Sequence, residues 1–230
     1  MQRKSLFLKA VGSVAALAAV VFVGMSITSP SGQARGEPND GKDEASEIKR
    51  GFAIAPVPLN LAGKNRALVG LGSYIVNAQG DCNGCHSAGP QTEFAPGGNP
   101  YFGQPTKLNP ATYLGGGRDF GPLIPGTPDI VSRNLTPDKT GRPEGGHTFQ
   151  EFVQIIRTGV DMDHLHPNCS PTVTTNCIPP PFDGDLLQIM PWPIYRNMTD
   201  HDLRAIYEYL SAIPCITGPP APSPLHNDCE

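Results

Sequence analysis

The chain has 230 residues with a formal charge of −4, and only 38% of its residues are hydrophobic. Gly and Pro number 26 each, together about 23% of the chain where roughly 12% is usual. This composition excludes a coiled coil, a helical bundle and a polytopic membrane protein, and leaves a loop-rich chain with little core material. The acidic balance also argues against nucleic acid as a partner, because binding phosphates needs a basic patch.

Residues 1–34 have the pattern of an export segment. Arg3, Lys4 and Lys9 precede residues 10–27, which carry no charge; a basic start followed by an apolar run is typical of a secretory signal or a membrane anchor. The run is longer than most signal cores and at the short end for a spanning helix. A cleaved signal and an anchor in the cytoplasmic membrane therefore both stay open, and either one exports the remaining chain to the periplasmic side.

Residues 35–64 are polar, charged and then Pro-rich, which predicts a linker rather than a domain. A helix is predicted over residues 65–78, with an apolar face formed by Leu68, Leu71 and Ile75. Gly72 lies on the same face, although glycine lowers helix stability relative to alanine. We therefore expect another helix, the C-terminal one, to pack closely against this position.

The sequence Cys82-Asn83-Gly84-Cys85-His86 is a C-x-x-C-H pattern, the attachment signature of c-type haem. Two thiols one helical turn apart reach the two vinyl groups of a porphyrin, and the adjacent histidine is held at the iron as its proximal ligand. Three alternative roles for the motif are less favoured. A Cys82–Cys85 disulfide gives His86 no role, a thioredoxin-like pair needs a βαβ context that the sequence lacks, and a zinc site needs more Cys or His nearby.

Loops dominate the segment that follows, in which only residues 128–131 are apolar enough to pair briefly as a strand. The three glycines from Gly115 to Gly117 lack the lysine and helix of a phosphate site, which favours a turn that brings backbone close to the haem. A helix is predicted from Thr148, where Glu151 completes a capping box, to Gly159.

A low-spin electron carrier needs a sixth iron ligand, usually Met or His. Met190 is the first candidate, since it lies in a stiff Met-Pro-Trp-Pro segment that cannot be helical. Met162 ranks second, and His164 with His166 offers bis-histidine ligation. Met198 directly precedes the cap of the last helix and is expected to pack there as a hydrophobic staple. The remaining rivals are His147, His201 and His226.

The last helix is predicted to begin after Thr199, with Asp202 in the capping-box position, and to end before Pro214. Four cysteines remain outside the haem motif, and exported cysteines usually pair. They allow three pairings. We prefer the pairing of nearest neighbours, which joins Cys169 to Cys177 and closes a C-terminal tail over residues 215–230 through Cys215 and Cys229.

The order of these features, a helix, C-x-x-C-H, loops, Met-Pro and a final helix, resembles a class I cytochrome c domain. The resemblance points to the cytochrome c subunits of membrane-bound periplasmic dehydrogenases, and it is strongest at Asn134-Leu135-Thr136-Pro137-Asp138, in the helix that ends at Gly159, and from Met190 to Leu210. Such subunits often carry several haem motifs, whereas this chain has one. Residues 168–185 look like an insertion, and the tail also extends beyond the family pattern.

The resemblance covers residues 65–214 as one domain and implies an all-α fold of three or more helices around one covalent haem, with His86 and Met190 as axial ligands. It implies a one-electron carrier that is not itself an enzyme, between a periplasmic dehydrogenase and an oxidase or other respiratory acceptor. The alternative is a peroxidase-like or ligand-binding haem protein with an open sixth position. A freely diffusing shuttle is less favoured, since such shuttles often dock through lysine-rich faces and this chain is acidic.

Two smaller expectations concern contacts to the haem. The second ring nitrogen of His86 needs an acceptor, often a backbone carbonyl, and the loop prolines Pro96 and Pro100 are candidates to supply it. Trp192 or Arg133 is expected to bond a haem propionate, with core packing as the alternative role for Trp192.

Overall fold

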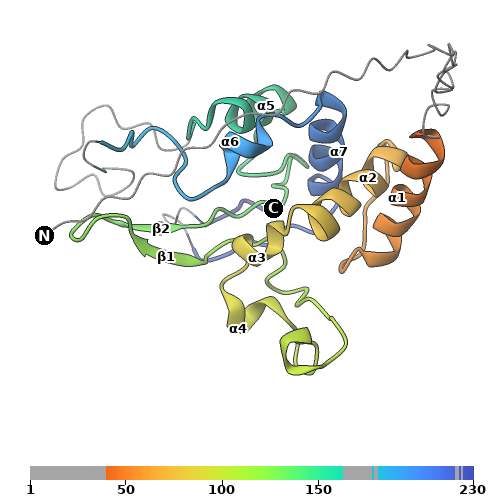
Figure 1. Ribbon diagram of the computed structural model, residues 1–230, viewed down its shortest axis with the longest axis horizontal. Coiled ribbons are helices and arrows are strands. Elements are labelled where there is room, and N and C mark those ends of the chain that lie inside the picture. The colour runs from red at the N-terminus through yellow and green to blue at the C-terminus, as the bar shows by residue number, and fades with distance from the viewer. Residues whose placement is uncertain (1–39, 163–177, 179–180, 221–222, 224) are drawn as a thin grey trace, which may run out of the picture. The chain divides into compact units, whose positions relative to one another are not determined.

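The computed structural model describes residues 40–162, 178, 181–220, 223 and 225–230 (Figure 1). The predicted export segment, residues 1–34, lies outside them, and no helix among the described residues is long and apolar enough to cross a membrane. The elements in chain order are α1 (Asp40–Ile54), α2 (Arg66–Tyr74), the π-helical turn η1 (Ile75–Gln79), α3 (Cys82–His86), α4 (Pro90–Glu93), the 3₁₀ turn η2 (Pro100–Phe102), β1 (Asp119–Pro122), β2 (Asp129–Val131), α5 (Phe149–Thr158), α6 (Trp192–Tyr195) and α7 (Asp200–Leu210).

Helices and loops make up most of the described chain, as predicted, and strand structure is confined there to one short antiparallel ribbon of β1 and β2. The ribbon pairs Asp119 with Val131 and Pro122 with Asp129, so the brief pairing expected of residues 128–131 is confirmed. The fold is therefore mainly helical and loop-rich, with one short ribbon beside the expected helices.

Helix α1 corrects the predicted linker over residues 35–64, because residues 40–54 are helical and pack on α2. The two helices approach closely at Gly51 and Gly70. A Cβ atom on Gly51 would collide with the backbone carbonyl of Gly70, and the buried Ser73 hydroxyl donates a 2.8 Å hydrogen bond to the Gly51 carbonyl oxygen. Tertiary packing of a narrow apolar stripe thus stabilises a helix whose sequence is mostly polar.

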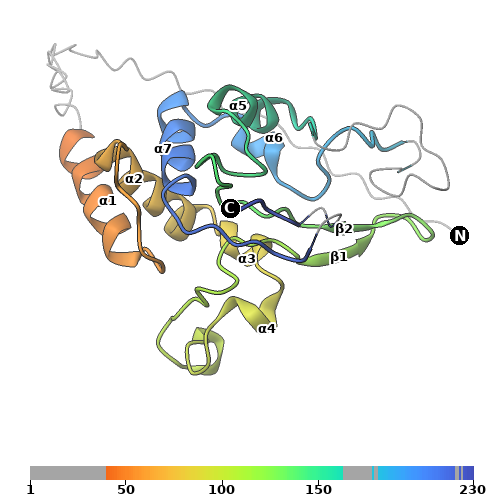
Figure 2. The same ribbon diagram turned by 180° about the vertical axis from the view of Figure 1, so that it is seen from behind.

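Helix α2 begins at the predicted position, where the Asn65 side chain accepts hydrogen bonds from the first turn. It lies beside α7, as Figures 1 and 2 show from opposite sides. Gly72 is at the crossing: a Cβ atom there would collide with the backbone carbonyl of Ala205 and meet Tyr209 Cβ at 2.8 Å. The expectation that Gly72 admits the C-terminal helix is confirmed. Buried side chains that fill this core include Val69, Val76, Phe152, Leu203 and Leu210.

The end of α2 widens into the π turn η1, whose last hydrogen bond runs from the Gly80 N–H to the Ile75 carbonyl at 2.7 Å. Asn77 within this turn joins a buried polar network. Its amide donates to the Tyr209 hydroxyl at 3.2 Å, and its carbonyl oxygen accepts from the Tyr113 hydroxyl at 2.5 Å. Burial is the main cause that raises the pKa of both tyrosines. The network ties the π turn to α7 immediately before the haem motif.

Helices α5 and α7 both have the predicted capping boxes. Thr148 and Glu151 exchange hydrogen bonds at the start of α5, and Thr199 and Asp202 do so at the start of α7. Gly159 ends α5 in the left-handed region with φ of 75°. Met198 packs against the cluster that contains Leu203, in agreement with the packing role expected of it.

The C-terminal tail is closed by a disulfide between Cys215 and Cys229, which confirms one of the two preferred pairs; Cys169 and Cys177 lie outside the described residues. The tail also packs on the loop before α5. The buried Asn227 amide donates to the carbonyl oxygens of Thr136 and Pro137 at 3.0 and 3.1 Å. From that loop, the Asn134 amide donates a 2.8 Å hydrogen bond to the Ile216 carbonyl oxygen of the tail.

Replacing Gly72 with alanine tests the α2–α7 crossing. Glycine to alanine usually stabilises an exposed helix by about 0.5–1 kcal/mol, but here the added methyl group meets backbone. We expect Gly72→Ala to lower the free energy of unfolding by about 1–3 kcal/mol in denaturant titration. Ser46→Ala on the exposed face of α1 is the control, expected within about 0.5 kcal/mol of the parent. Equal or greater stability of Gly72→Ala would contradict the crossing.

Removing the tail disulfide tests its contribution to stability. The cysteines are 14 residues apart in sequence, and closing a loop of this length stabilises by about 3 kcal/mol in the chain-entropy treatment. We expect the double variant Cys215→Ser, Cys229→Ser to unfold at lower denaturant concentration by that order of free energy. An unchanged midpoint would mean that the hydrogen bonds of Asn134 and Asn227 hold the tail unaided.

Candidate functional site

Helix α3 carries the C-x-x-C-H motif in a single helical turn. Both thiols are free, and Cys85 is exposed whereas Cys82 is partly buried. Asp81 precedes the turn in a left-handed conformation with φ of 46°, and a Cβ atom on Gly84 would lie 2.7 Å from the Asp81 carboxylate. The Gly84 carbonyl accepts a hydrogen bond from the Arg118 guanidinium. Gly84 therefore leaves room for the carboxylate of Asp81, the residue that precedes the motif.

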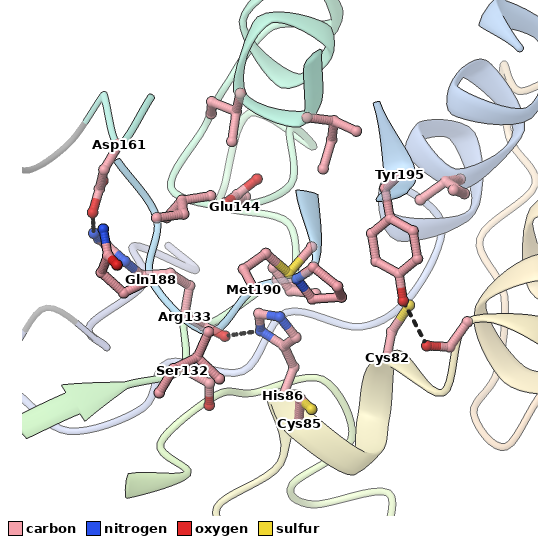
Figure 3. Close-up of a pocket in the computed structure, with 18 of the residues that line it drawn as sticks. Cys82, Cys85, His86, Ser132, Arg133, Glu144, Asp161, Gln188, Met190 and Tyr195 are labelled. Carbon is pink, nitrogen blue, oxygen red and sulfur yellow. Dashed lines mark hydrogen bonds and ion pairs between the residues drawn. The ribbon is translucent and has the colours of Figure 1, made fainter. Parts of the chain in front are cut away.

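Burial is the largest influence on the Cys82 thiol, and with the nearby Asp81 carboxylate it raises the pKa of Cys82 to about 12. A thiol with this pKa stays protonated at neutral pH and is a poor redox nucleophile. The environment thus differs from the electropositive one that a thioredoxin-like pair requires. Tyr195 lies beside it and donates a 3.1 Å hydrogen bond to the Gly80 carbonyl oxygen (Figure 3).

His86 points its Nδ1 at the Arg133 carbonyl oxygen, 2.8 Å away. A carbonyl only accepts, so Nδ1 carries the proton and the Nε2 lone pair faces away from the bond. Burial is the main cause that lowers the pKa of His86, which favours the neutral imidazole that a metal needs. The expected acceptor, a carbonyl of Pro96 or Pro100, is wrong: the partner comes from a segment much later in the chain.

The segment of three glycines, Gly115 to Gly117, lies between α3 and the segment that carries Arg133 and bonds to both. The Gly116 N–H donates to the His86 carbonyl oxygen at 2.8 Å, and the Gly117 N–H donates to that of Ser132 at 2.9 Å. Gly116 has φ of 72°, and a Cβ atom there would collide with the Arg133 backbone. The expected close approach of backbone is therefore present, but it is to the segment that carries the His86 acceptor.

A cavity of about 570 Å³ opens beside α3, within the roughly 300–1,000 Å³ typical of cofactor pockets. Cys82, Cys85, His86 and Met190 all line it (Figure 3). Its wall is mainly apolar and comes from η1, the segment after β2, α5, residues 187–191 and α7, with side chains such as Ile75, Leu135, Phe152, Ile156, Leu203 and Leu210. Leu225 of the disulfide-closed tail completes one side.

The structure separates the candidates for a sixth ligand. Met190 lines the cavity together with His86 (Figure 3). Its N–H donates to the Gln188 carbonyl at 2.7 Å, and its carbonyl accepts from the Trp192 N–H at 2.8 Å. The expectation that this segment cannot be helical is wrong for its second half, because α6 begins at Trp192 with Pro193 in its first turn. Met198 also lines the cavity, whereas Met162 does not. Among the histidines that the structure describes, His86 alone lines it, and His164 and His166 lie outside those residues.

The contacts of Trp192 are those of its alternative role, core packing. Its side chain is absent from the cavity wall, and its Nε1–H donates a 3.1 Å hydrogen bond to the Leu187 carbonyl oxygen. The ring packs over Gly159, where a Cβ atom would collide with it. Trp192 thereby joins the end of α5 to the segment that carries Met190.

The sequence did not predict the buried ion pair in the wall. The Arg133 guanidinium forms an ion pair with Asp161, and both side chains are largely buried, with 16% and 7% of their surface exposed. The sequence singled out Arg133 only as a propionate contact and said nothing of its carbonyl. Asp161 is next to Met162, but no local pattern distinguishes it, since its partner lies far away in sequence.

No protein-family model matches the chain, and no solved structure matches it. Curated relatives do. The gluconate 2-dehydrogenase cytochrome c subunit of Pantoea cypripedii is 31% identical over 147 residues, 63% of this chain and 23% of the relative. The cytochrome c subunit of the quinone alcohol dehydrogenase of Gluconacetobacter polyoxogenes is 29% identical over 165 residues, 72% of this chain and 25% of the relative.

The fructose dehydrogenase cytochrome subunit of Gluconobacter japonicus is 24% identical over 149 residues, 65% of this chain and 22% of the relative. The resemblance to cytochrome c subunits of dehydrogenases, stated from the sequence motifs, is confirmed by these relatives. The chain matches about a quarter of the length of each of them.

Replacing Trp192 with phenylalanine tests its structural role. The variant keeps an aromatic ring but loses the donor to Leu187 and part of the volume that packs over Gly159, so we expect the free energy of unfolding to fall by about 1 kcal/mol or more. The optical spectrum of the haem-loaded protein should stay that of the parent, because the side chain does not line the cavity. A changed spectrum at unchanged stability would restore Trp192 as a haem contact.

Proposed function

We propose that the chain is a one-electron carrier with a single covalently bound c-type haem, attached to Cys82 and Cys85 and ligated by His86 and Met190. The observation that carries this proposal is the convergence of these four residues on one apolar cavity, although Met190 lies far from the motif in sequence. The cytochrome c subunits among the relatives support the same class of function.

The residues present fit such a group. Two free thiols one helical turn apart are available for thioether bonds, and the neutral His86 has its Nδ1–H already engaged, which directs Nε2 to a metal. When bound, the haem supplies an iron that changes between the ferrous and ferric states. A neutral thioether ligand and an apolar wall favour the ferrous state and so raise the reduction potential.

The fold supports a class I arrangement in which helices and loops enclose the haem. The cavity is walled by η1, α5 and α7 together with loops from both halves of the domain, and residues 65–214 would form the cytochrome domain, extended at its N-terminal side by α1. Backbone hydrogen bonds fix the turn at Met190, and α6 begins directly after it, which supports the placement of a weak ligand there.

The partners and location are proposed from the relatives and the leader. A periplasmic dehydrogenase is the electron donor, and an oxidase or another respiratory component is the acceptor. The chain acts on the periplasmic side of the cytoplasmic membrane after export by residues 1–34, which either are cleaved or anchor it there. It serves as an electron-transfer subunit or local relay and is not itself the catalyst of the dehydrogenase reaction.

Optical spectroscopy of the purified haem-loaded protein tests the proposal. We expect a low-spin ferric spectrum with the charge-transfer band of a methionine–iron bond, because His86 and Met190 together complete six coordination. Met190→Ala should abolish the band and lower the reduction potential, whereas Met198→Leu, the other methionine of the cavity wall, should keep both.

The same measurement separates the alternative. A peroxidase-like or ligand-binding protein with an open sixth position has a high-spin ferric spectrum in the parent, and Met190→Ala leaves it unchanged. Loss of the band in Met198→Leu with retention in Met190→Ala would assign the ligand to Met198 instead.

A further inference from the structure

Arg133 faces the candidate haem site with two different groups. Its carbonyl oxygen accepts the 2.8 Å hydrogen bond from His86 Nδ1, and its guanidinium forms the buried ion pair with Asp161. Figure 3 shows both interactions on the cavity wall. The position of the carbonyl is therefore connected, through one side chain, to the position of a carboxylate on another segment.

Hydrogen bonds that do not involve Asp161 hold the backbone on both sides of Arg133. The Ser132 N–H donates to the Arg118 carbonyl oxygen at 2.9 Å, and the Leu135 N–H donates to that of Leu114 at 2.8 Å. Gly116 packs directly on the Arg133 backbone. These bonds hold the chain on both sides of Arg133, and the ion pair of its side chain adds a restraint on rotation of the Arg133 peptide plane about the chain direction.

Asp161 is well placed to limit that rotation, because its own backbone is anchored. Its N–H donates a 2.9 Å hydrogen bond to the Asp185 carbonyl oxygen, and the preceding Val160 pairs with Leu186 in an antiparallel bridge. The Asp161 side chain is buried, with 7% of its surface exposed. It is thus a fixed anion against which the Arg133 side chain is held.

We propose that Asp161 is a positioning residue that, through Arg133, fixes the acceptor of the His86 Nδ1 hydrogen bond and thereby sets the reduction potential of the haem. This inference rests on the proposed function. A stronger hydrogen bond at Nδ1 makes the imidazole a more basic ligand, which favours the ferric state. A carbonyl that turns away from Nδ1 weakens the bond, because hydrogen-bond strength falls steeply with angle, and the potential rises.

A change in potential alone does not identify this route, because removing a negative charge near the haem also raises the potential. The exchange of the His86 ring N–H with solvent deuterium reports the hydrogen bond itself. It is followed by NMR in the diamagnetic ferrous protein, and it responds to opening of this bond rather than to a distant charge.

We expect Asp161→Asn to raise the reduction potential and to speed His86 ring-proton exchange by about tenfold or more. Asp161→Glu, which keeps the charge and can still pair with Arg133, should recover most of the slow exchange. Asp228→Asn is the matched control, since it removes an exposed carboxylate paired with Lys139 and should leave both readouts unchanged. Parent-like ring-proton exchange in Asp161→Asn would overturn the inference, even if the potential moves.

Arg133→Gln is the second variant, which keeps the backbone carbonyl and removes the guanidinium; its expected result is the same fast exchange. If Asp161→Asn does not fold, as judged by circular dichroism, this variant decides alone, and slow exchange in it overturns the inference. Failure of the proposed function is distinguishable, because it is read from the parent spectrum: a high-spin parent contradicts methionine ligation whatever the exchange rates of the variants.

Discussion

The hydrogen bond from His86 Nδ1 to the Arg133 carbonyl is the contact on which the candidate site depends. It orients the imidazole, places the proton on Nδ1 and directs Nε2 into the cavity. It also accounts for the packing around it, since the glycine segment at Gly116 must lie against the Arg133 backbone to bring the two partners within 2.8 Å. A side chain at Gly116 would push apart the segments that this bond joins.

The cavity relates the low hydrophobic content of the chain to its loop-rich fold. A chain with few hydrophobic residues and many Gly and Pro lines an apolar space of about 570 Å³ with side chains from several loops and helices. In the proposed function a haem fills that space and supplies the apolar body that the side chains do not. The loops therefore depend on particular backbone conformations more than on large apolar side chains. The disulfide-closed tail contributes Leu225 to the cavity wall.

The sequence predicts those parts of the structure that depend on neighbouring residues or on a position where only glycine fits. Caps at Thr148 and Thr199 satisfy nearby N–H groups, and the small residue at Gly72 signals a close helix crossing. The prediction fails where distant packing decides. Helix α1 has a mostly polar sequence and is stabilised through Gly51 against α2, and the His86 acceptor lies 47 residues away in sequence. The Trp192 ring packs over Gly159 at the end of α5, a contact that no pattern around Trp192 predicts.

The π turn between α2 and the haem motif has a consequence for how the domain tolerates change in length. A regular α-helix advances each residue by about 100° around its axis, so the wider turn closed from Gly80 to Ile75 holds one residue more than a regular turn would. The direction in which the chain leaves α2 toward Cys82 is thus set by a residue count. Substitutions within Ile75–Gln79 change contacts, but a deletion there would rotate the whole attachment motif relative to the helix pair that anchors it.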